Sequence, residues 1–306
     1  MTVRIGVNLP HSGKKATAQG IVEAAIQAEA AGVSSLSATE RLLWPVAPVR
    51  TQDGELGTPP DHQVVLFDTL ETLTAAAVVT ERVELVTAIL VPFFQPPALL
   101  ARRLATLDQF SNGRLIVGVG QGWMREEFDH VNLSLRRRGD GLDDHLAAVK
   151  AAWGPDPVSY SGRFYSIPES YLGPKPVRLG GPPVLLGTQS VPGIRRAARW
   201  ADGILPVTSV GSRLEDLESA LRFFREATND EGRPQLDVRL RAHTRITQEP
   251  LTGDRVPCSG SIDQVRDDLL RLEKLGVSEV CLNQTQIGVP FEQQLADAVA
   301  VKQSLT

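Results

Sequence analysis

Short runs of β-favouring residues alternate with longer segments of helical periodicity along the 306 residues of this chain. The third run, residues 83–91, is almost entirely apolar, which is typical of a parallel strand covered on both faces. The helix expected after it begins at Pro97 and places Leu100, Leu104 and Leu107 on one face. A repeated strand–helix order of this kind predicts an α/β fold with a parallel sheet.

Eight strands are predicted, at residues 2–9, 34–38, 83–91, 115–119, 184–187, 203–207, 236–242 and 278–282. The predicted helices include residues 64–79, 142–153, 214–228 and 291–304, and a capping-box pattern at Ser261 and Gln264 opens another. Eight strand–helix units favour a (β/α)8 TIM barrel over the alternative, a doubly wound open sheet. We expect residues 1–306 to form a single domain, with residues 154–183 as an insertion after the fourth βα region.

The bulk composition excludes several classes of function. The net charge of −4 provides no basic field for nucleic acid. Cys258 and Cys281 have neither metal-ligand spacing nor enough partners for a disulfide framework. We find no signal peptide and no apolar run of membrane-spanning length, so a cytoplasmic location without a membrane partner is expected. The sequence also lacks the zinc-protease, nucleophile-elbow and Walker motifs, which weakens hydrolase and kinase hypotheses.

In a barrel of this type the active site lies at the C-terminal ends of the strands. After the fourth predicted strand, Gly118, Gly120 and Gly122 would let a flat ring or a phosphate approach the backbone closely. The alternative is a tight turn with Trp123 in the core. After the fifth strand, the segment at residues 187–190 precedes a helix and could bind an anion, or Ser190 could simply cap that helix.

Other polar residues follow predicted strands and are candidates on position alone, namely Asn8, His11, Glu40, Arg41 and His243. Each of them could equally be a hydrogen-bonded structural residue. The histidines expected on helices, His62, His130 and His145, are interpreted as surface or capping residues.

Two segments resemble signatures of the bacterial luciferase-like monooxygenase superfamily. They are Leu-Ala-Thr-Leu-Asp-Gln-Phe-Ser-Asn-Gly-Arg-Leu at residues 104–115 and the glycine-rich segment at 118–128. Further matches lie at residues 77–86, 162–165 and 195–206, and the resemblance weakens after about residue 206. It implies a barrel that binds coenzyme F420 or FMN at its C-terminal rim, and its style is closer to the F420-dependent branch.

The resemblance also implies which residues hold the cofactor. The ring would lie across the end of the third strand, often against a bulge with a non-proline cis peptide, at Thr87, Ala88 and Ile89. The cofactor loop matches Gly120, Gln121, Gly122 and Trp123, and the phosphate loop matches Gly187, Thr188, Gln189 and Ser190. Asn8 is assigned to the same cofactor site.

The sequence departs from the family pattern in two places. Relatives often have an acidic residue and a histidine after the second strand, where this chain has Glu40 and Arg41. Arg41 would then be free to pair with an anionic substrate or with an anionic tail of the cofactor. Relatives often have two glycines after the fifth strand, where this chain has Gly187 and Thr188, and the backbone path is kept if Thr188 avoids a left-handed conformation.

The hypothesis that follows is an oxidoreductase that transfers a hydride between F420 and a small organic substrate. Glu40, His11 and His243 are its catalytic candidates, as proton donor or acceptor. One alternative is an FMN-dependent monooxygenase that takes reduced flavin from a partner reductase and reacts it with oxygen. Two others are a non-catalytic flavin-binding protein and an unrelated phosphate-binding barrel enzyme. Relatives are commonly dimers, so a homodimer is expected, and no metal site is expected.

Overall fold

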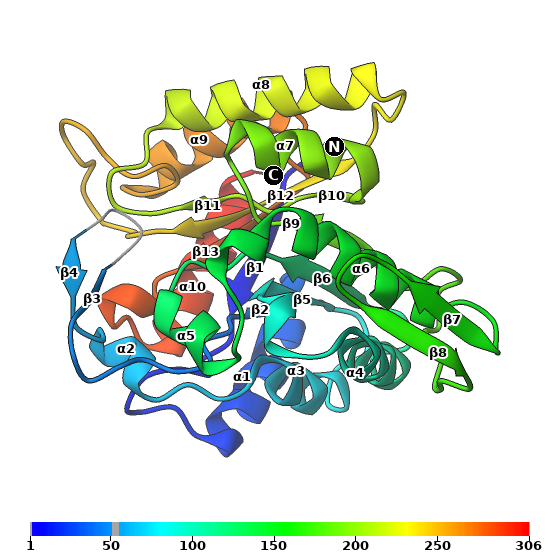
Figure 1. Ribbon diagram of the computed structural model, residues 1–306. Helices are drawn as coiled ribbons and strands as arrows, with labels where there is room; N and C mark the ends of the chain where they lie inside the picture. Colours follow the sequence, from blue (N-terminus) through cyan, green and yellow to red (C-terminus); the bar gives the residue numbers. More distant parts are fainter. Residues whose placement is uncertain (1, 51–54, 306) are drawn as a thin grey trace.

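The computed structural model describes residues 2–50 and 55–305 and contains one closed parallel barrel (Figure 1). Its sheet has the order β10-β9-β6-β5-β2-β1-β13-β12-β11, and an additional pairing between β10 and β12 closes it. The strands are β1 (Arg4–Asn8), β2 (Ser35–Ala38), β5 (Glu84–Leu90), β6 (Leu115–Val119), β9 (Val184–Leu186), β10 (Gly203–Ile204), β11 (Val207–Thr208), β12 (Asp237–His243) and β13 (Glu279–Asn283). The strands β10 and β11 together occupy the predicted sixth strand at residues 203–207. The predicted eight-stranded barrel is therefore confirmed, and the open-sheet alternative is wrong.

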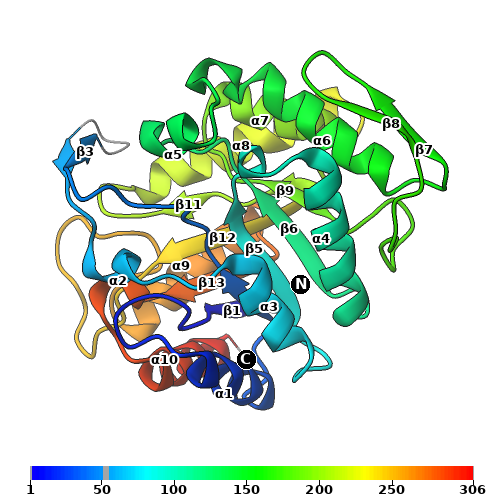
Figure 2. The same cartoon turned by 60° about the horizontal axis from the view of Figure 1, so that its bottom comes forward.

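Helices surround the barrel and cover its outer face (Figure 2). They are α1 (Ala18–Ala30), α3 (Thr69–Ala77), α4 (Pro97–Phe110), α6 (Asp140–Ala152), α7 (Val191–Trp200), α8 (Leu214–Asp230), α9 (Ile262–Lys274) and α10 (Phe291–Ser304). The predicted stripe of Leu100, Leu104 and Leu107 is buried, so the apolar face that the periodicity predicted for this helix is confirmed. The predicted capping box is also present, with Ser261 and Gln264 each bonded to the other's backbone.

The predicted helix at residues 64–79 is wrong in its first part. The structure has a short α2 (Asp61–Val64), an extended stretch, and then α3, which begins after Asp68. The Asp68 carboxylate accepts a hydrogen bond from the Leu70 amide at 2.9 Å and so caps the new helix. The extended stretch is held by a hydrogen bond from the Phe67 amide to the carbonyl of His11, a long-range contact that apolar periodicity cannot reveal.

The two long connections contain structure that the sequence did not predict. The connection at residues 39–61 contains the short strands β3 (Val49–Arg50) and β4 (Leu56–Gly57), and its residues 51–54 lie outside the described part. The insertion at 154–183 forms a hairpin of β7 (Val158–Ser161) and β8 (Ser166–Ser170). Asp144 of α6 ties this hairpin down, because its carboxylate accepts hydrogen bonds from Tyr160 at 2.7 Å and from the Phe164 amide at 2.7 Å. The helix α5 (Arg125–His130) and the 3-10 turns η1 (Pro92–Phe94), η2 (Leu135–Arg138) and η3 (Thr285–Ile287) complete the connections.

His145 is not the surface or capping residue that the sequence suggested. Its side chain is buried, and its Nε2 lies 2.8 Å from the carbonyl oxygen of Gln95. The ring packs edge-on against Tyr165 and Phe93. His145 therefore joins α6 to the connection after β5 as part of the core.

A buried ion cluster fills the N-terminal end of the barrel. The guanidinium of Arg239 lies 2.8 Å from a carboxylate oxygen of Glu84, 2.8 Å from Asp237 and 3.3 Å from Glu279. Burial alone would raise the pKa of Glu84, but the hydrogen bond and charge of Arg239 more than offset this and lower it. Because Arg239 and Glu279 are only 4% and 2% exposed, neither charge is stable without the other.

We predict that Arg239→Met lowers the free energy of unfolding by about 3–5 kcal/mol, because it removes the cation that lies among one buried and two part-buried carboxylates and leaves buried Glu279 with Arg4 at 3.7 Å as its ion-pair partner. Urea denaturation measures this loss. The control is Arg125→Met, since Arg125 forms an exposed pair with Asp129, with side chains 77% and 64% exposed. That variant is expected to lose no more than about 0.5 kcal/mol. Equal losses in the two variants would contradict the importance of the buried cluster.

Candidate active site

The C-terminal end of β5 is irregular in the way that the family resemblance implied. The pairing of β5 with β6 shifts register between Thr87 and Leu90, and the peptide bond between Ala88 and Ile89 is cis. The Thr87 hydroxyl donates to the carbonyl of Gly118 at 2.8 Å and fixes this end of β5 to β6. The bulge and the cis peptide are thus present, while the binding of a ring against them stays a prediction.

The glycines at the ends of β6 and β9 accommodate the side chain of Ile89. A Cβ added at Gly120 or Gly187 would meet the terminal atoms of Ile89. Their lack of a side chain therefore leaves room for Ile89 at the rim, next to the segment expected to hold the ring. The neighbouring Gln121 donates to the carbonyl of Arg138 at 2.9 Å, which attaches the loop to η2.

The segment at residues 187–190 forms the N-terminal cap of α7. Ser190 accepts a hydrogen bond from the Gly193 amide at 3.3 Å and donates its own amide to the Thr188 hydroxyl at 3.2 Å. The side chain of Gln189 donates to the carbonyl of Val207. Thr188 has no left-handed backbone, since the described non-glycine residues with positive φ are Asn112, Asn132 and Cys258. Capping is confirmed, and the hydroxyls and helix terminus are also suited to an anion.

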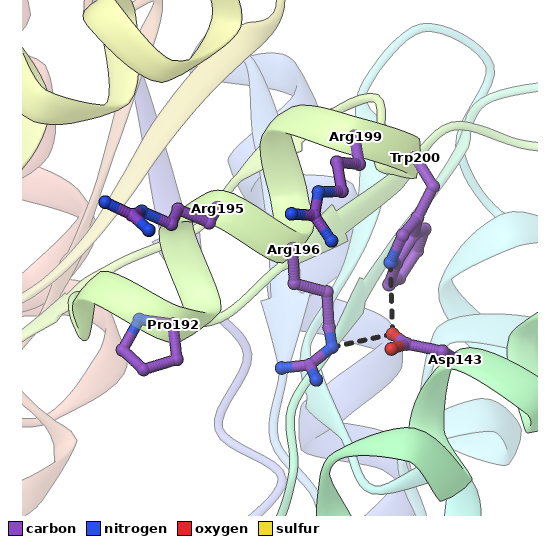
Figure 3. A pocket seen from close by; sticks show the side chains of 6 residues that line it. All are labelled: Asp143, Pro192, Arg195, Arg196, Arg199 and Trp200. Carbon is purple, nitrogen blue, oxygen red and sulfur yellow. Dashed lines mark hydrogen bonds and ion pairs between the residues drawn. The ribbon is translucent and has the colours of Figure 1, made fainter. Parts of the chain in front are cut away.

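A cavity of about 230 Å³ lies beside α7 and is rich in arginine (Figure 3). Asp143 of α6 points into it and accepts hydrogen bonds from Arg196 at 2.6 Å and from Trp200 at 3.2 Å. Arg195 extends away from Asp143 in Figure 3, and its guanidinium lies 5.9 Å from the ring centre of Phe223. In this cavity the charge of Arg196 is compensated by Asp143, whereas Arg195 contributes an exposed positive charge.

Arg41 is not free, in contrast to the expectation from the sequence. Its Nη1 lies 2.8 Å from a carboxylate oxygen of Glu127, which is buried in α5. The guanidinium also stacks on Trp123 and Trp44, 4.9 and 5.3 Å from the ring centres. Trp123 is thus part of an aromatic wall around Arg41, and any contact of Arg41 with substrate stays a prediction.

His11 is held by backbone groups on both sides of its ring. Its Nδ1 lies 2.9 Å from the carbonyl of Leu9, and its Nε2 lies 3.0 Å from the amide of Thr39. The side chain is fully buried, and burial lowers its pKa. His11 therefore joins the ends of β1 and β2, and neither ring nitrogen faces the mouth of the barrel without a partner.

His243 lies at the end of β12 and is uncharged at neutral pH. Burial lowers its pKa to about 2, and the nearby charge of Arg241 adds to this effect. Its Nε2 lies 3.2 Å from the side-chain amide of Gln286, and its buried Nδ1 has no hydrogen-bond partner. A proton-donating role for His243 at neutral pH is therefore disfavoured.

Glu40 has the properties of a proton donor or acceptor near neutral pH. Its carboxylate accepts a hydrogen bond from the Val91 amide at 2.6 Å, so it sits directly beyond the irregular end of β5. Burial raises its pKa to about 8, and the negative charges of Asp68 and Glu127 add to this effect. A carboxyl group with such a pKa is suited to general acid–base chemistry.

A smaller cavity of about 30 Å³ opens at the mouth of the barrel beside Arg241. Its lining includes Asn8, whose side chain donates to the Leu9 carbonyl at 2.9 Å, and Thr39. Three of its lining residues have a buried polar atom without a hydrogen-bond partner, namely Gln63 Oε1, Arg241 Nε and Thr285 Oγ1. Such atoms fit a polar ligand in the mouth. Arg241 was not among the residues predicted from the sequence, although its alternation with Arg239 in a predicted barrel strand was a usable signal.

No group of three or more histidine, cysteine, aspartate or glutamate side chains suited to a metal occurs in the part of the chain that the structure describes. Within the same residues, none of the helices combines the length and the apolar character needed to cross a membrane.

Comparisons with known proteins agree with this geometry. The sequence model of the luciferase-like monooxygenases matches residues 3–250. An uncharacterized protein of Mycobacterium tuberculosis is 30% identical over 230 residues, which cover 74% of this chain and 73% of that protein. An FMNH2-dependent dimethylsulfone monooxygenase of Pseudomonas putida is 35% identical over 126 residues, 40% of this chain and 34% of that enzyme. The solved structure of an F420-dependent secondary alcohol dehydrogenase has the same fold, with a TM-score of 0.78, 18% identity, and coverage of 98% and 99%.

We predict that Glu40 makes the wild-type protein less stable as pH rises from about 5 to about 8. The folded carboxyl keeps its proton up to its raised pKa of about 8, whereas the unfolded one loses it near its ordinary pKa, so stability is lost as pH rises through this window. Glu40→Gln should flatten this slope in melting temperatures measured across the range. The control Glu249→Gln, at an exposed residue, should retain the wild-type slope. An unchanged slope in Glu40→Gln would contradict the raised pKa.

Proposed function

The chain belongs to the luciferase-like monooxygenase family, and we propose that it is an oxidoreductase that binds F420 at the C-terminal rim of the barrel. In this proposal it transfers a hydride between F420 and a small organic substrate. The observation that carries the proposal is the position of Glu40. Its carboxyl accepts a hydrogen bond from the backbone amide of Val91, which lies two residues beyond Ile89. A titratable group with a pKa of about 8 thus adjoins the segment expected to hold the ring.

The residues at the rim fit such a cofactor in two ways. The hydroxyls of Thr188 and Ser190 lie 3.3 Å apart at the N-terminus of the ten-residue helix α7, where a phosphate is favoured. The end of β5, at Ala88 and Ile89, would support the ring. Bound F420 supplies the hydride chemistry, and the protein supplies orientation and a dry site.

The proton of the reaction is assigned to Glu40. When a carbonyl substrate is reduced, its oxygen gains a proton as its carbon gains the hydride, and the protonated carboxyl of Glu40 donates that proton. In the reverse direction the carboxylate accepts the proton from an alcohol. His11 and His243 are less suited, because the first is bonded to backbone on both sides and the second is uncharged at neutral pH.

The second candidate is an FMN-dependent monooxygenase that receives reduced flavin from a partner reductase. It is supported by the similarity to the dimethylsulfone monooxygenase of Pseudomonas putida. Oxygen consumption distinguishes the two functions, because the monooxygenase consumes oxygen during turnover and the hydride transferase does not.

A third candidate, a flavin-binding protein without turnover, would bind cofactor in the same assays and react with no acceptor. We also propose a cytoplasmic homodimer, as expected from relatives.

We predict that the purified chain binds F420 more tightly than FMN, measured side by side by quenching of tryptophan fluorescence. Ser190→Asp should weaken the binding of either phosphate-bearing cofactor by about tenfold or more, because it places a negative charge at the helix terminus. The control Ser219→Asp, on the exposed face of α8, should bind like the wild type. Tighter binding of FMN would favour the monooxygenase, and binding of neither would overturn the cofactor assignment.

We further predict that Glu40→Gln lowers kcat for reduction of a carbonyl substrate by about 10²–10⁴-fold while F420 binding is unchanged. The wild-type rate should fall as pH rises above about 8, because the carboxyl then loses its proton. The rate is measured from the absorbance of oxidised F420 over a panel of aldehydes and ketones. A wild-type pH profile in Glu40→Gln would show that another group supplies the proton.

A further inference from the structure

Three alternate residues of β12 carry their side chains toward the barrel interior, namely Arg239, Arg241 and His243. The first lies at the N-terminal end and has three carboxylate partners within 3.3 Å. Arg241 lies one layer higher, and its Nη1 donates to the carbonyl oxygen of Ala88 at 3.1 Å. Two arginines on one strand thus have opposite surroundings.

No carboxylate compensates Arg241 among the described residues. The hydrogen bond that the structure gives its side chain goes to a neutral carbonyl, and its buried Nε has no partner. Apart from Arg241, the cavity beside it is lined by amides, hydroxyls, Leu66 and His62, and by no aspartate or glutamate of the described chain. Burial lowers the pKa of Arg241 to about 10, so the side chain remains a cation at neutral pH.

The other arginines near the rim differ from Arg241. Arg41 is paired with Glu127 at 2.8 Å, and Arg196 is paired with Asp143 at 2.6 Å. A partly buried cation without an anion costs free energy, and a bound anion lowers that cost. The position of Arg241 therefore favours an anionic ligand in the mouth of the barrel.

The size and place of the cavity limit what that anion is. About 30 Å³ holds roughly two water-sized groups, because one needs about 15 Å³. A carboxylate has this size, and its two oxygens match the planar donors of a guanidinium. The acceptor of the Arg241 bond, Ala88, belongs to the segment expected to support the ring, so the anion would lie beside the reacting centre.

We infer that Arg241 binds a carboxylate of the substrate, so that the enzyme acts on small organic acids in which a carbonyl or alcohol carbon lies close to the carboxylate. This inference rests on the proposed function for the identity of the reaction, but the anion site itself does not require it. Arg241 would hold the substrate by its charge, and Glu40 would serve the reacting oxygen.

The test compares propionate with propionamide, which have nearly the same shape but differ in charge. At constant ionic strength, we expect propionate to raise the melting temperature of the wild-type protein and propionamide to leave it unchanged. Arg241→Gln should weaken propionate binding by about tenfold or more. Arg222→Gln, at an exposed arginine on α8, should bind propionate like the wild type.

A second measurement needs no variant and covers the case in which Arg241→Gln fails to fold. Phenylglyoxal modifies accessible arginines, and mass spectrometry locates the modified residues. We expect propionate to protect Arg241 from modification and propionamide not to protect it. Modification of Arg222 should be the same with either compound.

Both measurements are made without cofactor and with whichever of F420 or FMN binds. Absence of a propionate effect in both forms would overturn the inference. The inference would also be overturned if Arg241→Gln lost affinity only for the reduced, anionic cofactor, because Arg241 would then pair with the cofactor ring and not with the substrate. Propionate binding in a chain that binds neither cofactor would keep the anion site and reject the proposed function.

Discussion

A buried ion cluster at the N-terminal end of the barrel joins five of its strands. Arg239 on β12 meets Glu84 on β5 and Glu279 on β13, while Arg4 on β1 donates to Glu84 at 2.8 Å and Ser35 on β2 donates to Glu279 at 2.8 Å. A barrel interior must be filled, and here its lower layer is filled by compensated charge instead of by apolar side chains. The apolar layer above it contains Val86, Ile116, Leu185 and Leu205. The polar rim is therefore built on a closed lower end, which fixes the positions of the strand ends that form the site.

The order of strands and helices could be predicted from sequence because it depends on local pattern. Strand β6 and helix α10 have the bounds that were predicted, since both lie between clear turn or cap residues. The break before α3 could not be predicted, because the residues before Asp68 continue the apolar pattern. They are extended because their backbone pairs with the distant segment at residues 11–13. The burial of His145 likewise depends on Gln95 and Tyr165, which no spacing in the sequence connects to it.

The site was predictable in position and less so in the role of each residue. The segments after β5, β6 and β9 meet at the rim, because the C-terminal ends of neighbouring parallel strands do so by construction. Whether a polar residue is available for chemistry depends on its partners in space. Arg41 could not be recognised as paired, since its partner Glu127 is distant in sequence. Arg241 could not be recognised as unpaired, since the sequence does not show which side chains surround it in the barrel.

Glu40 and Arg241 divide the requirements of the proposed reaction between them. Hydride transfer to a carbonyl needs a proton for the oxygen and a fixed orientation for the carbon, and one residue cannot easily provide both. A carboxyl group kept protonated by burial would be deprotonated more readily if a cation lay against it. Arg241 donates a hydrogen bond to the carbonyl of Ala88, whereas Glu40 accepts one from the amide of Val91. Each side chain therefore contacts a different part of the same strand end. Burial and the negative charges of Asp68 and Glu127 raise the pKa of Glu40, and together they outweigh the Val91 hydrogen bond and the charge of Arg103, which lower it. Because Arg241 and Glu40 contact different residues of this strand end, Arg241 can bind an anion while Glu40 stays protonated and available as a proton donor.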